Sequence, residues 1–235
     1  MSDMNPTYVE RRQELTRYFD RTAAAAWERL TSDAPVGRVR ATVRAGRDAM
    51  RQTLLDWLPE DLGGCTLLDA GCGTGALAIA AAERGARVTA VDVSPTLLDV
   101  AKQRTPDTVA GRIDYRAGDM LDADRGPFDF VVAMDSLIHY PLADMIDAIA
   151  LLAGMAQQRV LTTFAPRTPA LTVMHVVGRM LPHREHRAPA IEPASEYKLL
   201  AGIQAHSGLE HWQAGRGKRV SSGFYVSQAQ ELRHA

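Results

Sequence analysis

The hydrophobic and polar positions divide the chain of 235 residues into an amino-terminal helical region, a central alternating region and a less regular end. Residues 1–60 are rich in charge, and their apolar positions recur at helical spacing, as at Leu15, Tyr18 and Phe19. From residue 63 to 165, short apolar runs instead alternate with amphipathic segments. This alternation is typical of parallel strands joined by right-handed helical crossovers. We therefore expect an α/β fold that is preceded by helices.

The central region predicts a strand at each short apolar run that closes on glycine, proline or an acidic residue. The expected strands lie at residues 65–68, 86–92, 113–120, 128–135 and 160–165. In an open α/β sheet, ligands bind at the carboxyl ends of such strands. The residues that follow each predicted strand are therefore the first candidates for a binding site.

The rhythm of strands and helices breaks after the fifth strand. Residues 166–207 predict an insertion with one helix that starts at Pro169 and another over residues 192–206. Two closing strands are expected at 208–214 and 222–227. Such a hairpin suits an antiparallel last strand inserted in a mostly parallel sheet, and the insertion suits a substrate cap.

A glycine-rich loop, Asp69-Ala70-Gly71-Cys72-Gly73-Thr74-Gly75, lies between the first predicted strand and a helix. Strand, glycine loop and helix bring backbone close to a nucleotide-like ligand, and glycine permits positive φ. Asp69 would repel a pyrophosphate but not an ammonium or a sulfonium group. The loop resembles that of class I S-adenosylmethionine (SAM) methyltransferases. Gly71, Gly73 and Ala76 also satisfy the dinucleotide pattern, so an NAD(P)-dependent oxidoreductase and a turn without ligand stay open at this point.

The tips of the next strands carry further acids. Asp92 lies where an acid binds ribose hydroxyls in both families, so it does not discriminate between them. Asp119 ends the third strand, where the acid of a SAM enzyme accepts from the adenine amino group. A solvated turn acid is the alternative. The predicted SAM-binding residues are Asp69, Gly71, Gly73, Asp92, Val93, Asp119, Met120 and Asp135.

Composition adds bounds rather than chemistry. A hydrophobic content of 46% supports a core, and the formal charge of −1 gives no sign of a nucleic-acid-binding protein. Apolar runs are too short for a membrane span, and the start does not resemble a secretion signal, so we expect a cytoplasmic protein for which peripheral membrane contact is left open. Cys65 and Cys72 are interpreted as small core residues. His183 and His186 lack the spacing of a zinc helix, and no protein-bound metal is predicted.

Four segments narrow the resemblance. Arg17-Tyr18-Phe19-Asp20, the glycine loop, Ile138-His139-Tyr140-Pro141 and Phe164-Ala165-Pro166-Arg167-Thr168-Pro169 together resemble the magnesium-protoporphyrin IX methyltransferase family, and the final Phe224-Tyr225 also matches. The resemblance covers most of the chain and is weakest from 183 to 193. It implies a class I methyltransferase (Rossmann-like) fold, with a mostly parallel sheet and an antiparallel last strand. We divide the chain into a helical lid over 1–60 and a methyltransferase domain over 61–235.

The resemblance also implies the reaction. SAM, as co-substrate, would methylate one propionate of magnesium-protoporphyrin IX in (bacterio)chlorophyll biosynthesis, giving the monomethyl ester and S-adenosylhomocysteine. Magnesium enters only as part of the porphyrin. Tyr18 and His139 would serve the acceptor site as catalytic residues, and the porphyrin-binding subunit of magnesium chelatase is an expected contact. The alternative is a SAM-dependent methyltransferase acting on another small molecule, such as a quinone precursor.

The acceptor chemistry leaves the role of His139 open. A propionate with a pKa near ~4.3 is already ionised at neutral pH, so holding and partly desolvating it matters more than removing a proton. His139 is then a base, an orienting donor or an axial ligand of the porphyrin magnesium, and we favour orientation. The structural alternative is a histidine bonded to a backbone carbonyl. Candidate partners of the second propionate, each more often a solvated surface charge, are Arg167, Arg179, Arg184 and Arg187.

Overall fold

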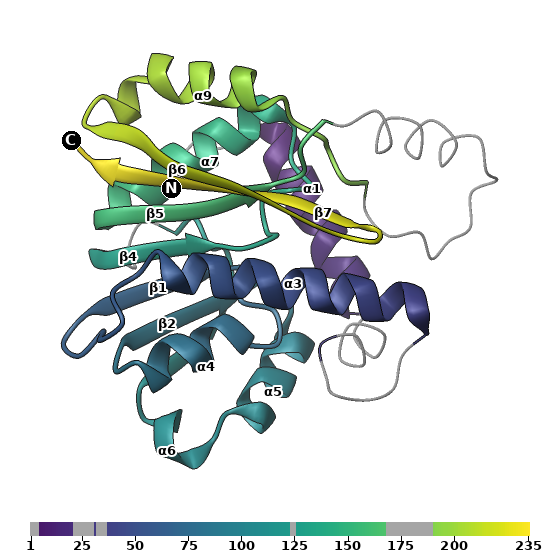
Figure 1. Cartoon of the computed structure of the whole chain (residues 1–235), viewed down its shortest axis with the longest axis vertical. Coiled ribbons are helices and arrows are strands. Elements are labelled where there is room, and N and C mark those ends of the chain that lie inside the picture. The colour runs from purple at the N-terminus through teal and green to yellow at the C-terminus, as the bar shows by residue number, and fades with distance from the viewer. Residues whose placement is uncertain (1–4, 21–30, 32–36, 123–125, 168–189) are drawn as a thin grey trace.

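A mixed sheet of seven strands forms the centre of the protein, in the order β3-β2-β1-β4-β5-β7-β6 (Figure 1). The computed structural model describes residues 5–20, 31, 37–122, 126–167 and 190–235. The strands are β1 (Thr66–Ala70), β2 (Arg87–Asp92), β3 (Ile113–Ala117), β4 (Phe128–Ala133), β5 (Ala156–Phe164), β6 (Trp212–Ser222) and β7 (Tyr225–His234). Strands β1 to β5 pair in parallel, and β7 lies antiparallel between β5 and β6. The predicted fold class is confirmed, including the inserted antiparallel last strand.

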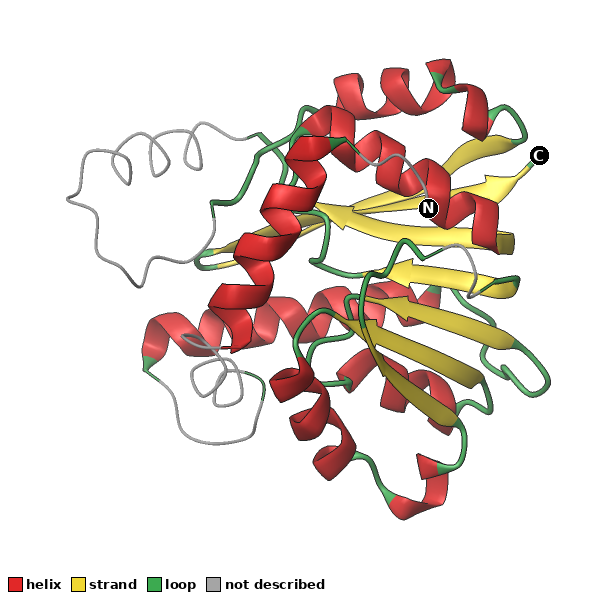
Figure 2. Ribbon diagram, turned by 180° about the vertical axis from the view of Figure 1, so that it is seen from behind, coloured by secondary structure: helices red, strands yellow, loops and turns green. Residues whose placement is uncertain are grey.

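Helices cover both faces of the sheet. They are α1 (Pro6–Tyr18), α3 (Arg38–Asp56), α4 (Ala76–Glu83), α5 (Pro95–Arg104), α6 (Asp107–Ala110), α7 (Leu142–Met155) and α9 (Glu196–Ala205). Figure 1 shows α3 and α4 in front of the sheet, and Figure 2 shows the opposite face, which α1 and α7 cover. Buried side chains form one core cluster on each face. The order of the strands turns back between β1 and β4, and ligands bind at such a switch point.

The predicted boundary at residue 60 does not follow the packing. Helix α3 buries Met50, Leu54 and Leu55 in the core cluster that also holds residues of β1 and α4. Burial of such side chains ties a helix to the sheet with about 1.5–3 kcal/mol each. Helix α3 therefore belongs to the methyltransferase core, and the lid hypothesis can only concern the chain before it. Trp27 and Leu30 lie outside the described residues.

The insertion prediction needs a similar correction. Helix α9 begins after Ser195, later than the expected residue 192, and buries Leu199 and Ile203 in the core cluster shared with α7. It is part of the layered core and not of a cap. The helix predicted from Pro169 lies outside the described residues.

The closing hairpin is shifted relative to the prediction. Residues 207–209 form a short 3-10 helix, and the hairpin turn falls at Gly223, with φ 57°, inside the segment expected to be the second strand. The apolar residues around Tyr225 therefore span a turn, and the prediction of a single strand over 222–227 is wrong. The fifth strand is also longer than expected, because α7 passes directly into β5 at Ala156.

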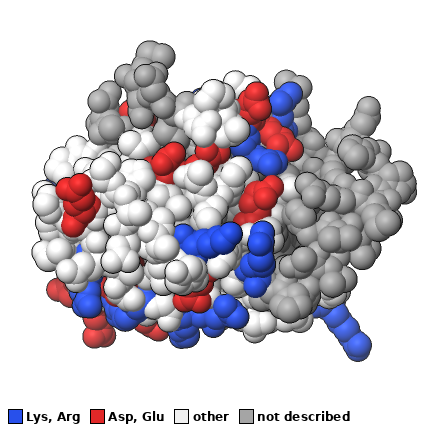
Figure 3. Space-filling view, turned by 90° about the horizontal axis from the view of Figure 1, so that it is seen from above, with Lys and Arg blue, Asp and Glu red and all other residues white. Residues whose placement is uncertain are grey.

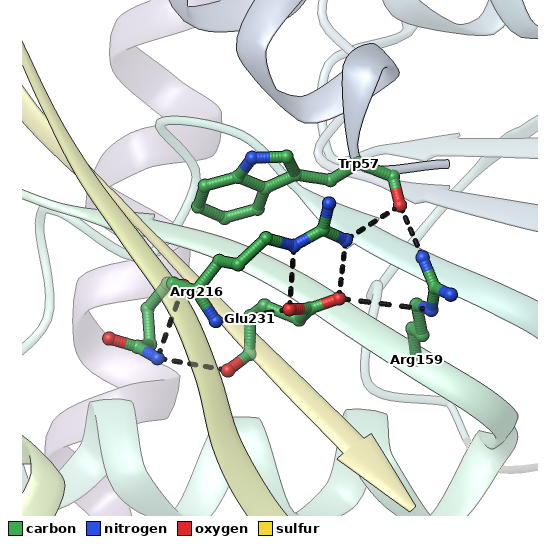
Figure 4. A network of polar contacts seen from close by, with 5 residues as sticks. Trp57, Arg159, Arg216 and Glu231 are labelled. Atoms are coloured by element: carbon green, nitrogen blue, oxygen red, sulfur yellow. Dashed lines mark hydrogen bonds and ion pairs between the residues drawn. The ribbon is translucent and has the colours of Figure 1, made fainter. Parts of the chain in front are cut away.

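An ion-pair network holds the hairpin against the end of α3 (Figure 4). Arg216 Nε donates to Glu231 Oε2 over 2.9 Å, and Arg216 Nη2 donates to Glu231 Oε1 over 2.6 Å. The same Nη2 donates to the Trp57 carbonyl over 2.9 Å, and the guanidinium lies over the Trp57 ring at 5.1 Å. Arg159 of β5 contacts both Glu231 and the Trp57 carbonyl. The last strand is thereby joined to β5, β6 and α3.

Within the described part of the chain, no helix is both long and apolar enough to cross a membrane. Nor do histidine, cysteine and acidic side chains of these residues gather in groups of three or more that could hold a metal ion. Positive and negative side chains are interspersed on the face that Figure 3 shows.

Candidate active site

A cavity of about 300 Å³ opens at the carboxyl ends of β1, β2 and β4, where α1 and α3 complete its walls. Of the eight predicted SAM-binding residues, seven line this cavity. The seven are Asp69, Gly71, Gly73, Asp92, Val93, Met120 and Asp135. His139 also lines the cavity. Asp119 and Tyr18 are not among the lining residues.

The glycine loop packs closely against the segment that follows β4. Gly71 has φ 82°, and a Cβ added there would lie 2.4 Å from the Cβ of Ser136. Asp92 organises the loop, because its Oδ2 accepts from Gly73 N over 2.8 Å and its Oδ1 accepts from Ser94 N over 2.9 Å. The dihedral angle and the close approach both require glycine at position 71.

Asp69 is a buried acid with an unsatisfied oxygen atom. Its side chain is buried, and Oδ2 has no hydrogen-bond partner in the described part of the chain. Burial, together with the neighbouring charge of Asp92, raises the pKa of Asp69 to about 7. Burial also raises the pKa of Asp92 to about 6, although hydrogen bonds from Ser94 and Gly73 oppose the shift. Two buried carboxyl groups side by side favour a cationic ligand, which would stabilise their ionised forms.

Asp119 faces α1. Its Oδ1 accepts from the hydroxyl of Tyr8 over 2.8 Å and from Leu121 N over 3.0 Å, and its Oδ2 pairs with Arg12. The ring of Tyr8 stacks on Tyr140 with centroids 4.7 Å apart. The carboxylate thus anchors α1 beside the cavity, and its predicted contact with adenine stays a prediction.

His139 follows β4 and has a defined tautomer. Its Nδ1 lies 3.1 Å from the carbonyl oxygen of Ala190. A carbonyl only accepts, so Nδ1 carries the proton and Nε2 of the neutral ring has a lone pair. Burial lowers the pKa of His139 below its ordinary value, which favours the neutral ring. The carbonyl contact weighed as the structural alternative is present, and it leaves Nε2 for chemistry.

The structure places Phe19 at the cavity, where Tyr18 is expected from the sequence. Tyr18 is half-buried, its pKa is raised by burial, and its ring meets Phe19 edge-on at 5.2 Å. Phe19, not Tyr18, lines the cavity and lies 6.5 Å from the His139 ring. The predicted catalytic role of Tyr18 therefore stays a prediction.

Asp135 is surrounded by donors. Arg47 donates to its Oδ2 over 2.8 Å, Tyr225 OH lies 3.0–3.1 Å from both oxygens, and Oδ1 accepts from Ser227 and Thr163. The residue has φ 53°, in the left-handed region. Its prediction as a SAM contact stays untested, and its hydrogen bonds indicate a different task, since they come from the protein itself.

Sequence reasoning missed the side chains that α1 and α3 contribute. These are Tyr8, Leu15, Arg44, Arg47, Asp48 and Arg51. The arginines lie three, four and seven positions apart on one face of α3, a spacing visible in the sequence. What the sequence does not show is that this face meets the tip of β4, more than eighty residues later.

Comparison with known proteins places this geometry. A family model described as "Magnesium-protoporphyrin IX methyltransferase C-terminus" matches residues 133–234, and one described as "Methyltransferase domain" matches residues 67–158. The chain is 43% identical over 231 residues to the magnesium-protoporphyrin O-methyltransferase of Rhodobacter capsulatus, covering 98% of this chain and 100% of that protein. The chain belongs to the magnesium-protoporphyrin IX methyltransferase family.

Further members of the magnesium-protoporphyrin IX methyltransferase family support the assignment. The protein from Synechocystis is 30% identical over 218 residues, with 91% of this chain and 92% of that protein covered. The crystal structure of the Synechocystis enzyme ChlM with bound SAH matches with a TM-score of 0.83 at 28% identity, over 95% of this chain and 99% of that one. The prediction of a SAM-dependent methyltransferase is confirmed, and the NAD(P)-dependent alternative is wrong.

Proposed function

We propose that this protein transfers the methyl group of SAM to one propionate carboxylate of magnesium-protoporphyrin IX, giving the monomethyl ester and S-adenosylhomocysteine. The observation that carries the proposal is the continuous cavity, which joins the unsatisfied acid at the end of β1 to His139 and the arginines of α3. Family membership names the substrate class. The cavity supplies what that reaction needs, namely an acidic pocket for a cationic donor and a basic wall for an anionic acceptor.

At the SAM end, we assign the ammonium group to Asp69 and the ribose hydroxyls to Asp92. Asp69 offers the unpartnered Oδ2, whereas each oxygen of Asp92 already accepts from a backbone N–H. A carboxylate has about four lone-pair sites, so Asp92 retains capacity for ribose. Gly71 and Gly73 admit the ligand, and Val93 and Met120 supply apolar surface for the adenine ring.

At the acceptor end, His139 provides a lone pair at Nε2. The propionate is ionised at neutral pH, so no proton has to leave before it attacks the methyl group. A neutral Nε2 then suits an axial ligand of the porphyrin magnesium, or a base for the fraction of acceptor that burial keeps protonated. The orienting-donor role that we favour from the sequence needs a proton on Nε2, which the bond from Nδ1 to Ala190 opposes.

Incubation of the protein with SAM and magnesium-protoporphyrin IX, followed by mass spectrometry, tests the proposed reaction. We expect the porphyrin to gain the mass of one methyl group in place of one hydrogen, with formation of S-adenosylhomocysteine. A phenolic quinone precursor serves as the competing acceptor. Methylation of the phenol and not of the porphyrin would assign the protein to another methyltransferase reaction.

We also propose that α1 acts as a lid over the cavity. Its Tyr8 and Leu15, and Phe19 directly after it, line the cavity, and the helix is tied down through Asp119 and through Thr7, whose hydroxyl donates to Asp144 over 2.6 Å. Amide hydrogen exchange tests this role. Exchange in α1 should slow when S-adenosylhomocysteine binds, whereas exchange that is as slow as in α7 without ligand would show a fixed part of the core.

Two contacts outside the cavity complete the proposal. Val39 of α3 and Phe224 of the hairpin turn are exposed, and the turn packs against α3 where Gly223 meets Thr42. Together with Arg38 and Arg40 they support peripheral contact with an anionic membrane, which vesicle flotation of a Phe224→Ser variant tests.

Delivery of the porphyrin by the porphyrin-binding subunit of magnesium chelatase rests on the family resemblance, and a pull-down with that subunit tests it.

A further inference from the structure

Asp135, the acid that follows β4, is held by side chains from three elements of the protein. The side chain of Asp135 is 4% exposed, and its donors come from α3, β5 and β7. Its own backbone N–H donates to Thr163 Oγ1 over 2.7 Å, so both ends of the residue are fixed. Side chains from distant parts of the chain thus converge on one carboxylate, and only Arg47 among them has a charge.

Arg47 reaches Asp135 because α3 comes unusually close to β7. A Cβ at the preceding Gly46 would lie 2.4 Å from the ring of Tyr225. That same ring carries the hydroxyl that donates to Asp135. Tyr225 therefore sets both the height of α3 above the sheet and the position of the carboxylate that Arg47 contacts. The guanidinium is 21% exposed and lines the cavity.

The charge of this wall is basic on balance. Helix α3 places Arg44, Arg47 and Arg51 at the cavity, together with Asp48, which pairs with Arg51 over 2.9 Å. Together with Asp135, these side chains count three guanidinium groups and two carboxylates, and the described lining of the cavity also holds Asp69 and Asp92. Arg44 precedes Arg47 by one helical turn on the same face, about 4.5 Å along the axis. An anionic group of the substrate is the natural complement to this wall.

We propose that Arg47, positioned by Asp135, binds the propionate of the substrate that is not methylated. This inference rests on the proposed function, because it requires a porphyrin with two propionates. A guanidinium bonds both oxygens of a carboxylate in a fixed fork. Such a fork stabilises the negative charge on both oxygens and so lowers their nucleophilicity, which suits the carboxylate that anchors the substrate and not the one that reacts. Asp135 is a positioning residue, since it acts through Arg47.

A comparison of three porphyrins separates this role from a general loss of activity. The first is magnesium-protoporphyrin IX, and the others are the two isomeric magnesium porphyrins in which one propionate is replaced by an ethyl group. The isomer that keeps the reacting propionate is used for comparison. The wild-type kcat/KM should favour the dipropionate about 10- to 100-fold, as expected for a hydrogen-bonded charge pair.

The variants then assign the preference to residues. Arg47→Gln should remove the preference for the dipropionate by lowering kcat/KM of that substrate alone. Asp135→Asn, which retains a residue tolerant of the left-handed region, should reduce it through KM. Arg87→Gln is the control, because Arg87 is an exposed arginine at the start of β2 that does not line the cavity. If Arg47→Gln folds poorly, Arg47→Lys retains one charge without the fork and should keep part of the preference.

Binding measurements keep this test independent of the reaction. Each porphyrin is titrated into the protein with S-adenosylhomocysteine present, and tryptophan fluorescence is followed. A wild-type protein that methylates no porphyrin would overturn the proposed function, while the ratio of the two dissociation constants would still decide the role of Arg47. Equal losses for both substrates in Arg47→Gln, or an unchanged preference, would overturn the anchor.

Discussion

Asp69 in β1 and Asp135 just after β4 lie on neighbouring strands and line the same cavity, yet their surroundings are opposite. Asp69 is buried with one oxygen that has no partner in the described structure, whereas Asp135 accepts from Arg47, Thr163, Tyr225 and Ser227. Buried polar groups are nearly always hydrogen-bonded. An acid left without a partner therefore indicates a ligand site, and an acid saturated by the protein indicates a support. The comparison supports the proposed division into a cofactor end and an acceptor end.

The largest expected effect comes from a variant that should stop turnover without weakening SAM binding. We expect His139→Ala to lower kcat by roughly 10²- to 10⁴-fold, the usual span for a positioned acid–base group. SAM affinity, measured by calorimetry, should be unchanged, because His139 belongs to the acceptor end. A loss of SAM binding in this variant would merge the two ends into one.

The pH profile of kcat sharpens the same prediction. In the proposed mechanism the neutral ring is the active form, and burial lowers the pKa of His139. Activity should therefore fall on an acidic limb that lies below the ordinary imidazole pKa of about 6.5. The limb should be missing from the residual activity of His139→Ala. Substantial rescue by His139→Gln would instead favour an orienting donor.

Identical changes at the two acids provide a matched pair. Asp69→Asn should weaken SAM binding by about 2–3 kcal/mol, because the ammonium loses a charged acceptor. Asp135→Asn should leave SAM affinity within about twofold, since its carboxylate serves Arg47. Calorimetry of both variants measures the difference. Equal losses would mean that Asp135 also contacts SAM.

Stability should respond in opposite directions to the loss of a hydrogen-bonded acid and to the loss of an acid without a full set of partners. Glu231→Gln should destabilise the protein by about 1–3 kcal/mol, because it weakens charged hydrogen bonds to Arg216, a partner that is half-exposed. Asp69→Asn should raise the melting temperature of the ligand-free protein, because it removes a buried charge without a full set of partners. Thermal unfolding without SAM measures both, with Glu210→Gln as an exposed control. A destabilised Asp69→Asn protein would show that the acid serves the fold.

The smallest expected effect concerns pH and SAM affinity. The pKa of Asp69 is raised to about 7, so in the free protein this carboxyl is mostly protonated at pH 6 and mostly ionised at pH 8. SAM requires the ionised form, and its affinity should fall about tenfold from pH 8 to pH 6, with proton release on binding. The free protein should lose stability as pH rises from about 4 to about 7, because over this range the carboxyl of Asp69 is ionised in the unfolded chain but still protonated in the folded protein. Asp69→Asn should abolish most of this dependence.

The cofactor end could be predicted from the sequence because its parts are local. Strand, glycine loop and helix adjoin one another, and Asp69 and Asp92 each end a predicted strand. The acceptor end depends on contacts such as that of Arg47 with Asp135, 88 residues apart, and that of Tyr225 with Asp135, 90 residues apart. No periodic pattern reports such pairings. For the same reason Phe19 and Tyr18 could not be told apart, because both lie on the apolar side of α1.

The position of β7 in the sheet orders events during synthesis. Ribosomes release the chain from its amino end, so the elements that form the SAM loop emerge while Tyr225, Ser227 and Glu231 are still to be made. The support of Asp135, and with it the placement of Arg47, can form only once the final strand has inserted between β5 and β6. A nascent chain can thus acquire its cofactor pocket early, whereas the support of Asp135 is completed only after β7 has been made.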